Sequence, residues 1–183
     1  DSGCVITLGS ITLDTAPEII IDLQGTDITC FGFDNGSIEA TVTGGVAPFN
    51  FDWIGPAGFV SIDEDLSNLA AGEYILLVTD DTGCEGQANI TIAEPDELLV
   101  DVLASNQLCF GELGSIDISI SGGTGPYLIS WTGPNSFTSS DEDLSNLEMG
   151  IYDLTIEDDN ACIFNQSIEL SAPEELIVNT NPI

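Results

Sequence analysis

The sequence predicts an all-β protein of tandem immunoglobulin-like β-sandwich repeats of about 78 residues, arranged as beads on a string. Three observations support this prediction. The heptad DEDLSNL occurs at residues 63–69 and again at 141–147. Apolar and polar residues alternate with the two-residue period of half-buried strands. Gly-Gly, Gly-Pro and Asp-Asp clusters separate these segments, as turn residues do.

The shift of 78 residues between the two heptads also divides the chain, because it relates Pro17, Pro95 and Pro173. We expect sandwich repeats at 17–94 and 95–172, the C-terminal end of an incomplete repeat at 1–16, and the start of a further repeat at 173–183. A native chain rarely starts in mid-repeat, so a longer array within a larger precursor is expected.

Alternating segments recur in the same order in both repeats. In the first repeat they cover 38–42, 49–53, 74–78 and 90–92, in the second 116–120, 127–131, 152–156 and 168–170, and a further strand over 98–102 follows Pro95. Trp53 and Trp131 each end an aromatic strand at equivalent positions, which favours a place in the core over a role as sugar-stacking platforms. About seven short strands with an aromatic anchor on the third are typical of an immunoglobulin-like sandwich.

The charge of the chain excludes several partners. It has no Lys, Arg or His, and 32 Asp and Glu residues give a formal net charge of -32. Nucleic acids and anionic membranes are bound through Lys and Arg, so we expect no nucleic-acid binding and no membrane insertion. A hydrophobic content of 43% predicts a folded chain. Repulsion among the carboxylates calls for external salt or divalent cations.

Catalysis has few groups to use. Without His, Lys or Arg the chain lacks an imidazole base, a Schiff-base amine and a guanidinium clamp. Paired carboxylates of the glycosidase kind remain, but the acidic residues recur with the repeat, as scaffold residues do. We therefore predict that the protein is not an enzyme.

Five cysteines occupy two recurring positions, early in a repeat (Cys30, Cys109) and late in a repeat (Cys4, Cys84, Cys162). The favoured scheme joins Cys30 to Cys84 and Cys109 to Cys162, leaving Cys4 to the preceding repeat, because such bridges add on the order of 4 kcal/mol to a small domain. Pairing Cys4 with Cys30 and Cys84 with Cys109 is one alternative, and free thiols are another. Disulfides indicate a compartment outside the cytoplasm.

Acidic clusters are the candidate metal sites, since Ca²⁺ takes six to eight oxygen ligands from carboxylates and carbonyls. The competing interpretation, which the sequence favours, is that Asp65 and Asp143 cap turns, that Asp80 and Asp81 form a hairpin turn, and that the other acids are solvated. No other cofactor is indicated. The candidate Ca²⁺ ligands are Asp63, Asp65, Asp80, Asp81, Asp141, Asp143, Asp158 and Asp159.

A series of motifs in fixed order covers nearly the whole chain. The second repeat carries Cys109-Phe-Gly, Gly114-Ser-Ile, Gly122-Gly-Thr-Gly-Pro, Trp131-Thr-Gly-Pro and Asp158-Asp-Asn-Ala-Cys, and the first carries the same pattern from Cys30-Phe-Gly to Asp81-Thr-Gly-Cys. This pattern resembles the SprB-type repeat of large gliding-motility adhesins. The resemblance implies a very long surface protein of a gliding bacterium, exported by the type IX secretion system, whose repeats form a stalk.

From these features we expect an extracellular, cell-surface location. The expected function is a structural stalk segment of a large secreted adhesin or filament that extends a binding region from the cell in adhesion or gliding motility. The alternatives are a Ca²⁺-dependent adhesion module that binds glycans or surfaces directly, and a non-catalytic spacer of a secreted enzyme. Expected partners are neighbouring repeats of the same chain, with filament self-assembly and surface polysaccharide as further candidates.

Two further sites complete the predictions. The loops 55–59 and 133–137 differ between the repeats around an exposed tip, which makes Phe59 and Phe137 the candidate ligand contacts. Asp14-Thr15-Ala16 is similar to the O-glycosylation acceptor found among such bacteria, so Thr15 is a candidate glycan site.

Overall fold

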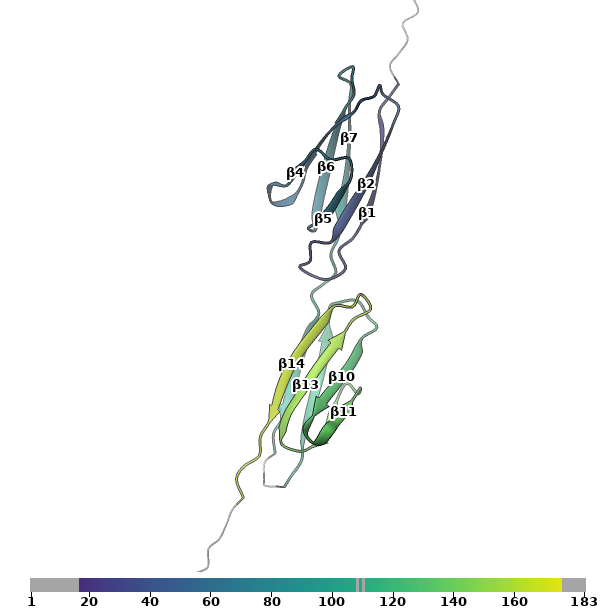
Figure 1. Cartoon of the computed structure of the whole chain (residues 1–183). Helices are drawn as coiled ribbons and strands as arrows, with labels where there is room; N and C mark the ends of the chain where they lie inside the picture. Colours follow the sequence, from purple (N-terminus) through teal and green to yellow (C-terminus); the bar gives the residue numbers. More distant parts are fainter. Residues whose placement is uncertain (1–16, 108, 110, 176–183) are drawn as a thin grey trace, which may run out of the picture. The chain divides into compact units, whose positions relative to one another are not determined.

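The computed structural model of the 183-residue chain describes residues 17–107, 109 and 111–175 (Figure 1). Within these ranges the chain is all-β apart from two short 3-10 turns, Pro56–Gly58 and Pro134–Ser136. The described residues form two compact units: unit 1 holds residues 17–25, Ser37–Ser67 and Gly72–Thr91, and unit 2 holds Thr26–Gly36, Asn68–Ala71 and residues 92–175. No helix in the described part is long and apolar enough to cross a membrane.

The first seven strands form two sheets, in the orders β1-β2-β5 and β4-β3-β6-β7. Their bounds are β1 Ile20–Thr26, β2 Gly36–Thr43, β3 Asn50–Ile54, β4 Val60–Ser61, β5 Leu66–Leu69, β6 Gly72–Thr79 and β7 Glu85–Ile92.

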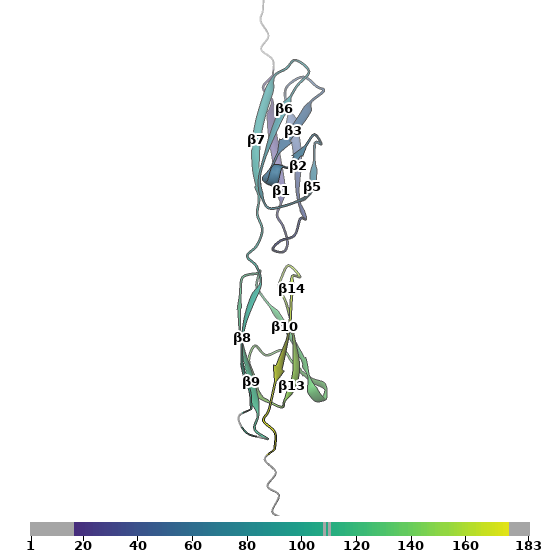
Figure 2. The same ribbon diagram turned by 90° about the vertical axis from the view of Figure 1, so that its left-hand side faces the viewer.

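The next seven strands repeat this arrangement. They are β8 Leu99–Ser105, β9 Gly114–Ser121, β10 Leu128–Gly133, β11 Phe137–Ser139, β12 Leu144–Leu147, β13 Gly150–Glu157 and β14 Ile163–Leu170. One antiparallel sheet has the order β12-β9-β8 and the other the order β11-β10-β13-β14. Figure 2 shows β8 and β9 in one layer and β10, β13 and β14 in the other. This is the predicted immunoglobulin-like sandwich.

Two-residue alternation places the apolar residues between the sheets. In β9, for example, Ile116 and Ile118 are buried while Asp117 and Ser119 are exposed to solvent. Trp53 and Trp131 are almost completely buried, and each indole N–H donates to a main-chain oxygen, that of Asp63 at 2.9 Å and that of Asp141 at 3.0 Å. A buried indole N–H usually has such a partner, and the burial of both side chains confirms the prediction that the tryptophans belong to the core.

The second half of the heptad DEDLSNL is a strand in both copies, although it lies outside the strands predicted from the alternation. Strand β12 pairs with β9 through Leu144 and Ile116, and the register shifts between Ser145 and Leu147. Asn146 has a φ of 57° at this irregularity. The bulge places two leucines three residues apart on the same buried side, a spacing that a period of two cannot predict.

Candidate functional site

The best-defined polar site is the hairpin between β13 and β14, which is organised by Asp158. This side chain is 4% exposed. Its Oδ1 accepts hydrogen bonds from the backbone N–H groups of Asn160 and Cys162, both at 2.9 Å, and its Oδ2 accepts one from the N–H of Thr124 at 2.9 Å. Asp159 N–H also donates to the Thr124 carbonyl at 2.8 Å. One carboxylate therefore fixes the hairpin and ties it to the turn that precedes β10.

Asp80 organises the hairpin between β6 and β7 in the same way. Its Oδ1 accepts from the N–H and hydroxyl of Thr82 at 2.9 and 2.7 Å and from the N–H of Cys84 at 2.9 Å, and its Oδ2 accepts from Val46 N–H at 3.0 Å. The Thr82 hydroxyl is the largest cause that lowers the pKa of Asp80; burial opposes it, and the N–H donors of Cys84, Val46 and Thr82 add to it. These donors take the place of water around the carboxylate and so favour the charged form of Asp80.

The heptad acids also have partners in the backbone. Asp65 Oδ1 accepts from Ala40 N–H in β2 at 3.0 Å, and Asp143 Oδ1 accepts from Ile118 N–H in β9 at 3.1 Å. Each carboxylate thus satisfies a strand N–H beside the start of β5 or β12.

Asp63 and Asp141 form local turns instead. Asp63 accepts from the Ser61 hydroxyl and donates its N–H to the same oxygen, at 3.0 and 3.1 Å, and Asp141 has the same two bonds with Ser139. The remaining candidates, Asp81 and Asp159, are exposed. Within residues 17–107, 109 and 111–175 no group of three or more His, Cys, Asp or Glu is arranged to hold a metal ion. Binding of Ca²⁺ stays a prediction.

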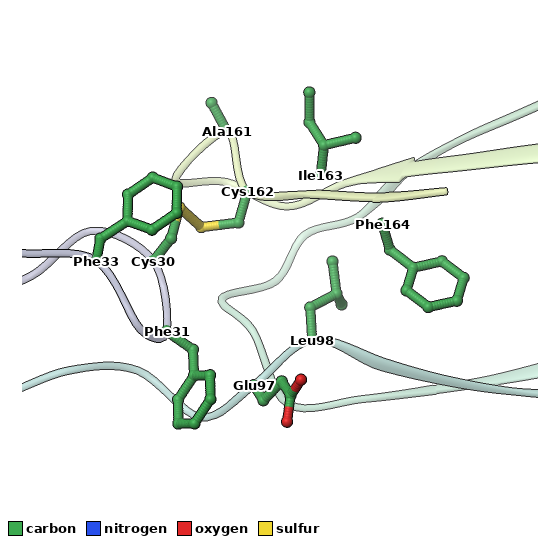
Figure 3. Close-up of a pocket in the computed structure, with 9 residues that line it drawn as sticks. All are labelled: Cys30, Phe31, Phe33, Glu97, Leu98, Ala161, Cys162, Ile163 and Phe164. Atoms are coloured by element: carbon green, nitrogen blue, oxygen red, sulfur yellow. A yellow bond between two sulfur atoms is a disulfide. The ribbon is translucent and has the colours of Figure 1, made fainter. Parts of the chain in front are cut away.

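The cysteines pair differently from both predicted schemes. Cys30 is bonded to Cys162 (Figure 3), with their Cα atoms 5.6 Å apart. Cys84 and Cys109 are exposed free thiols. The bond joins the early cysteine of the first predicted repeat to the late cysteine of the second, over a sequence separation of 132. The predicted Cys30–Cys84 and Cys109–Cys162 pairs are therefore wrong, because Cys84 and Cys109 are not bonded. Cys4 lies outside the described residues.

The physical reason is that the two cysteines of one repeat lie at opposite ends of a strand. Cys162 directly precedes β14, whereas the connection that carries Cys109 is held at the other end of β14, where Gln107 N–H donates to the Ser171 carbonyl at 3.2 Å. A strand of eight residues spans roughly 25 Å. A disulfide requires Cα atoms within about 7 Å, so this pairing cannot form in the folded repeat.

The segment that carries Cys30 has a defined conformation. Ile28 N–H donates to the Ala93 carbonyl at 2.9 Å, and Gly32 N–H donates to Glu94 Oε2 at 3.0 Å. Thr29 is fixed by Asn35, whose side-chain NH₂ donates to the Thr29 hydroxyl at 2.7 Å. The cysteine is therefore presented by an ordered loop.

Asn160 makes the polar contact beside the disulfide. Its side-chain NH₂ donates to the Thr29 carbonyl and to the Thr124 hydroxyl, both at 3.1 Å. An open pocket of about 420 Å³ adjoins the bond. Phe31, Phe33 and Phe164, drawn in Figure 3, are the aromatic residues that line it. The sequence analysis did not predict these three phenylalanines. The Cys-Phe-Gly motif at each early cysteine is a signal that could have indicated Phe31.

The candidate ligand contacts Phe59 and Phe137 pack against the core. Phe59 meets the ring of Tyr74 edge-on with ring centroids 5.3 Å apart, and Phe137 meets Tyr152 in the same way at 5.4 Å. Both phenylalanines are half-buried, so each helps to hold its loop against the sandwich. Ligand contact stays a prediction, and Thr15 lies outside the described residues.

Fold and site together define an all-β protein of immunoglobulin-like sandwiches whose acidic residues stabilise turns. The family model of the SprB repeat matches residues 24–58 and 104–136, at corresponding places in the two predicted repeats. The predicted resemblance is thus confirmed, and the chain contains SprB-repeat sequence in both regions. This repeat indicates an adhesin-like region of a surface protein, and such repeats and folds are typically non-catalytic.

Comparison with known proteins adds two distant structural similarities. The chain is similar to the crystal structure of DIP-gamma IG1+IG2 at 15% identity, covering 89% of this chain and 100% of that one, with a TM-score of 0.48. It is also similar to murine CEACAM1b at 14% identity, covering 76% of this chain and 94% of that one, with a TM-score of 0.31. A search of the curated proteins finds no match.

Proposed function

We propose that this chain is a structural stalk segment of a large secreted cell-surface adhesin or filament, which extends a binding region from the cell in adhesion or gliding motility. The observation that carries the proposal is the Cys30–Cys162 disulfide, because it bonds residues of two successive predicted repeats. A covalent bond between successive repeats can transmit tension from one repeat to the next, which is the task of a stalk. The SprB repeat supports the proposal, since it occurs in surface proteins.

The disulfide makes a mechanical difference that follows from its position in the chain. It closes a loop that contains β2 to β13 completely, and of the strands in the described residues only β1 and β14 lie outside it. Once β1 and β14 have detached from their neighbouring strands, tension applied to the two ends of the chain passes through the sulfur atoms and does not extend the strands inside the loop. By constraining the unfolded chain, a loop of this length also stabilises the folded state by about 5 kcal/mol.

The acidity of the chain suits an exposed stalk outside the cell. A net charge of -32 keeps neighbouring chains apart through mutual repulsion. It also disfavours edge-to-edge pairing of the many strands, for which charged side chains are a common protection. A disulfide persists in an oxidising compartment, which supports export from the cell, with type IX secretion as the proposed route.

The proposal is tested by changing the number of repeats in the full-length protein on its own cells. In-frame removal of 78-residue units should shorten the surface structure seen by electron microscopy in proportion to the number removed, and antibodies against this chain should label unpermeabilised cells. A matched control replaces the removed units with the same number of copies of residues 95–172, which should restore the length.

Two results would contradict the stalk. If the control restores length but adhesion remains lost, the replaced repeats bind the ligand directly, as the adhesion-module alternative holds. If a hydrolase on the same chain loses surface attachment while adhesion is unaffected, the repeats are the spacer of a secreted enzyme. Surface polysaccharide and a second copy of the protein are the partners to examine at the distal end.

A further inference from the structure

Among the cysteines that the structure describes, two are exposed and have no disulfide, Cys84 and Cys109. Cys84 occupies the late position of the first repeat, as Cys162 does in the second, and Cys109 occupies the early position of the second repeat, as Cys30 does in the first. Each free thiol is therefore the counterpart of a cysteine that is bonded in the same chain.

The two late cysteines lie in hairpins of the same conformation. Asp80 N–H donates to the Cys84 carbonyl and Asp158 N–H to the Cys162 carbonyl, both at 3.0 Å. In both hairpins the aspartate carboxylate also accepts from the cysteine N–H at 2.9 Å. The residue before the cysteine has a positive φ in each, 84° at Gly83 and 62° at Ala161. Cys84 is thus presented as Cys162 is.

The described residues around the two early cysteines share two backbone hydrogen bonds. Phe33 N–H donates to the Cys30 carbonyl and Glu112 N–H to the Cys109 carbonyl, both at 3.1 Å. Two residues before each cysteine, a backbone N–H donates to the carbonyl of the residue directly after a strand. Ile28 donates to Ala93 after β7, and Gln107 donates to Ser171 after β14. In its described residues, the segment that carries Cys109 is thus held like the segment of Cys30 that bonds Cys162.

We propose that Cys84 and Cys109 continue the Cys30–Cys162 bond into the neighbouring repeats. Cys84 bonds the early cysteine of a repeat before this one, and Cys109 bonds the late cysteine of a repeat after it. This inference rests on the proposed function, since it requires a stalk that continues on both sides. The partner in each case is another repeat of this type that presents its cysteine in the loop or hairpin described above.

The oxidation that forms each bond is balanced by an exported thiol oxidase. Each pair of thiols loses two protons and two electrons as the sulfur–sulfur bond forms. The reactive disulfide of the oxidase accepts the two electrons through a mixed disulfide and is released as a dithiol. The free thiols of Cys84 and Cys109 are exposed, so an enzyme can reach them.

Such bonds form an interlocked series, because Cys109 lies inside the loop that Cys30 and Cys162 close. The next loop therefore begins before the previous one ends. The shortest covalent path from one bond to the next runs from a late cysteine to the following early one, about 25 residues as between Cys84 and Cys109. Each such path of about 25 residues advances the array by two repeats of about 78 residues each. The unfolded array with disulfides is therefore roughly sixfold shorter than the same array without them.

The first test maps the disulfides of the full-length protein as its cells export it. Free thiols are alkylated before lysis, and the chain is cut at acidic and aromatic residues, since it offers no site for trypsin. We expect the Cys84 peptide to be joined to a peptide that carries an early Cys-Phe-Gly motif, and the Cys109 peptide to one with a late hairpin. Recovery of Cys84 bonded to Cys109 in one chain, or of both residues alkylated, overturns the proposal.

A second test uses the purified chain in a Cys4→Ser background. The Cys84→Ser and Cys109→Ser variants are oxidised with a glutathione buffer, each alone and then mixed in equal amounts. We expect a disulfide-linked dimer chiefly in the mixture, because only there do a late and an early cysteine meet. Dimers that form as fast in either single-variant sample show that the thiols pair without selection, which contradicts the proposal. Neither test measures filament length, so the stalk and the bonds can fail separately.

Discussion

Replacing Asp158 with alanine should destabilise the second sandwich severely, although the residue lies in a hairpin at one end of the fold. The change removes the acceptor of three backbone N–H groups, those of Thr124, Asn160 and Cys162. The carboxylate is 4% exposed, so water cannot take its place without opening the hairpin.

The size of the effect follows from the number of bonds lost. A hydrogen bond to a charged group contributes about 1.5 to 3 kcal/mol, and a donor left without a partner costs about 1 to 3 kcal/mol. Since the hairpin lies near solvent, part of this cost is recovered by hydration after local opening. We therefore expect the free energy of unfolding to fall by about 3 kcal/mol, a large part of the stability of a small domain.

The assay is urea unfolding followed by the fluorescence of Trp131, in a Trp53→Phe background that leaves one tryptophan. The matched control is Asp159→Ala, which removes the same charge from the adjacent residue, whose side chain is exposed. We expect the control to change the free energy of unfolding by less than about 0.5 kcal/mol. Asp158→Asn should lie between the two, because the amide oxygen still accepts. Equal effects of the two alanine variants would refute this role of the carboxylate.

Three further predictions concern acid, the loop tips and cations. The pKa of Asp80 is lowered from 3.8, chiefly by the Thr82 hydroxyl, so its stabilising effect is present above about pH 3.8 and is lost as the pH falls through the lower folded value. Thr82→Val brings the folded value nearer to 3.8, so urea titrations should show a smaller loss that is complete at a higher pH. Phe137→Ala should lower the free energy of unfolding by about 2 kcal/mol through loss of its edge-on tyrosine contact, and no loss would leave Phe137 free for a ligand. Ca²⁺ and Mg²⁺ at matched ionic strength should raise the melting temperature equally through screening, whereas a larger rise with Ca²⁺ that Asp65→Asn with Asp143→Asn abolishes would establish a calcium site.

The strands and the core could be predicted from the sequence because each is encoded locally. The alternation around Ile116 and around Tyr152 has the period of a strand, and the structure buries both residues. The recurrence of Trp53 as Trp131 likewise predicted core positions correctly. Strands β5 and β12 were missed because their leucines have a spacing of three, with Asn68 and Asn146 at positive φ between them.

The cysteine pairing could not be predicted, because it depends on the end of the sandwich at which each cysteine lies. The positions of Cys30 and Cys162 in the repeat are plain from the sequence. The distance between them depends on the register of every hairpin and the length of every strand that separates them. The same limit applies to Asp158, whose partner Thr124 is 34 residues away. Long-range bonds of this kind follow from the topology, and the local pattern does not contain them.

Pulling the single molecule from its two ends shows whether tension on this chain passes through the disulfide between the two predicted repeats. In the oxidised chain we expect complete unfolding to release no length from the 132-residue loop between Cys30 and Cys162. A reducing agent, or Cys162→Ser, should add about 450 Å of contour length. Oxidised and reduced chains that reach the same contour length, with each sandwich unfolding in full under both conditions, would contradict the claim.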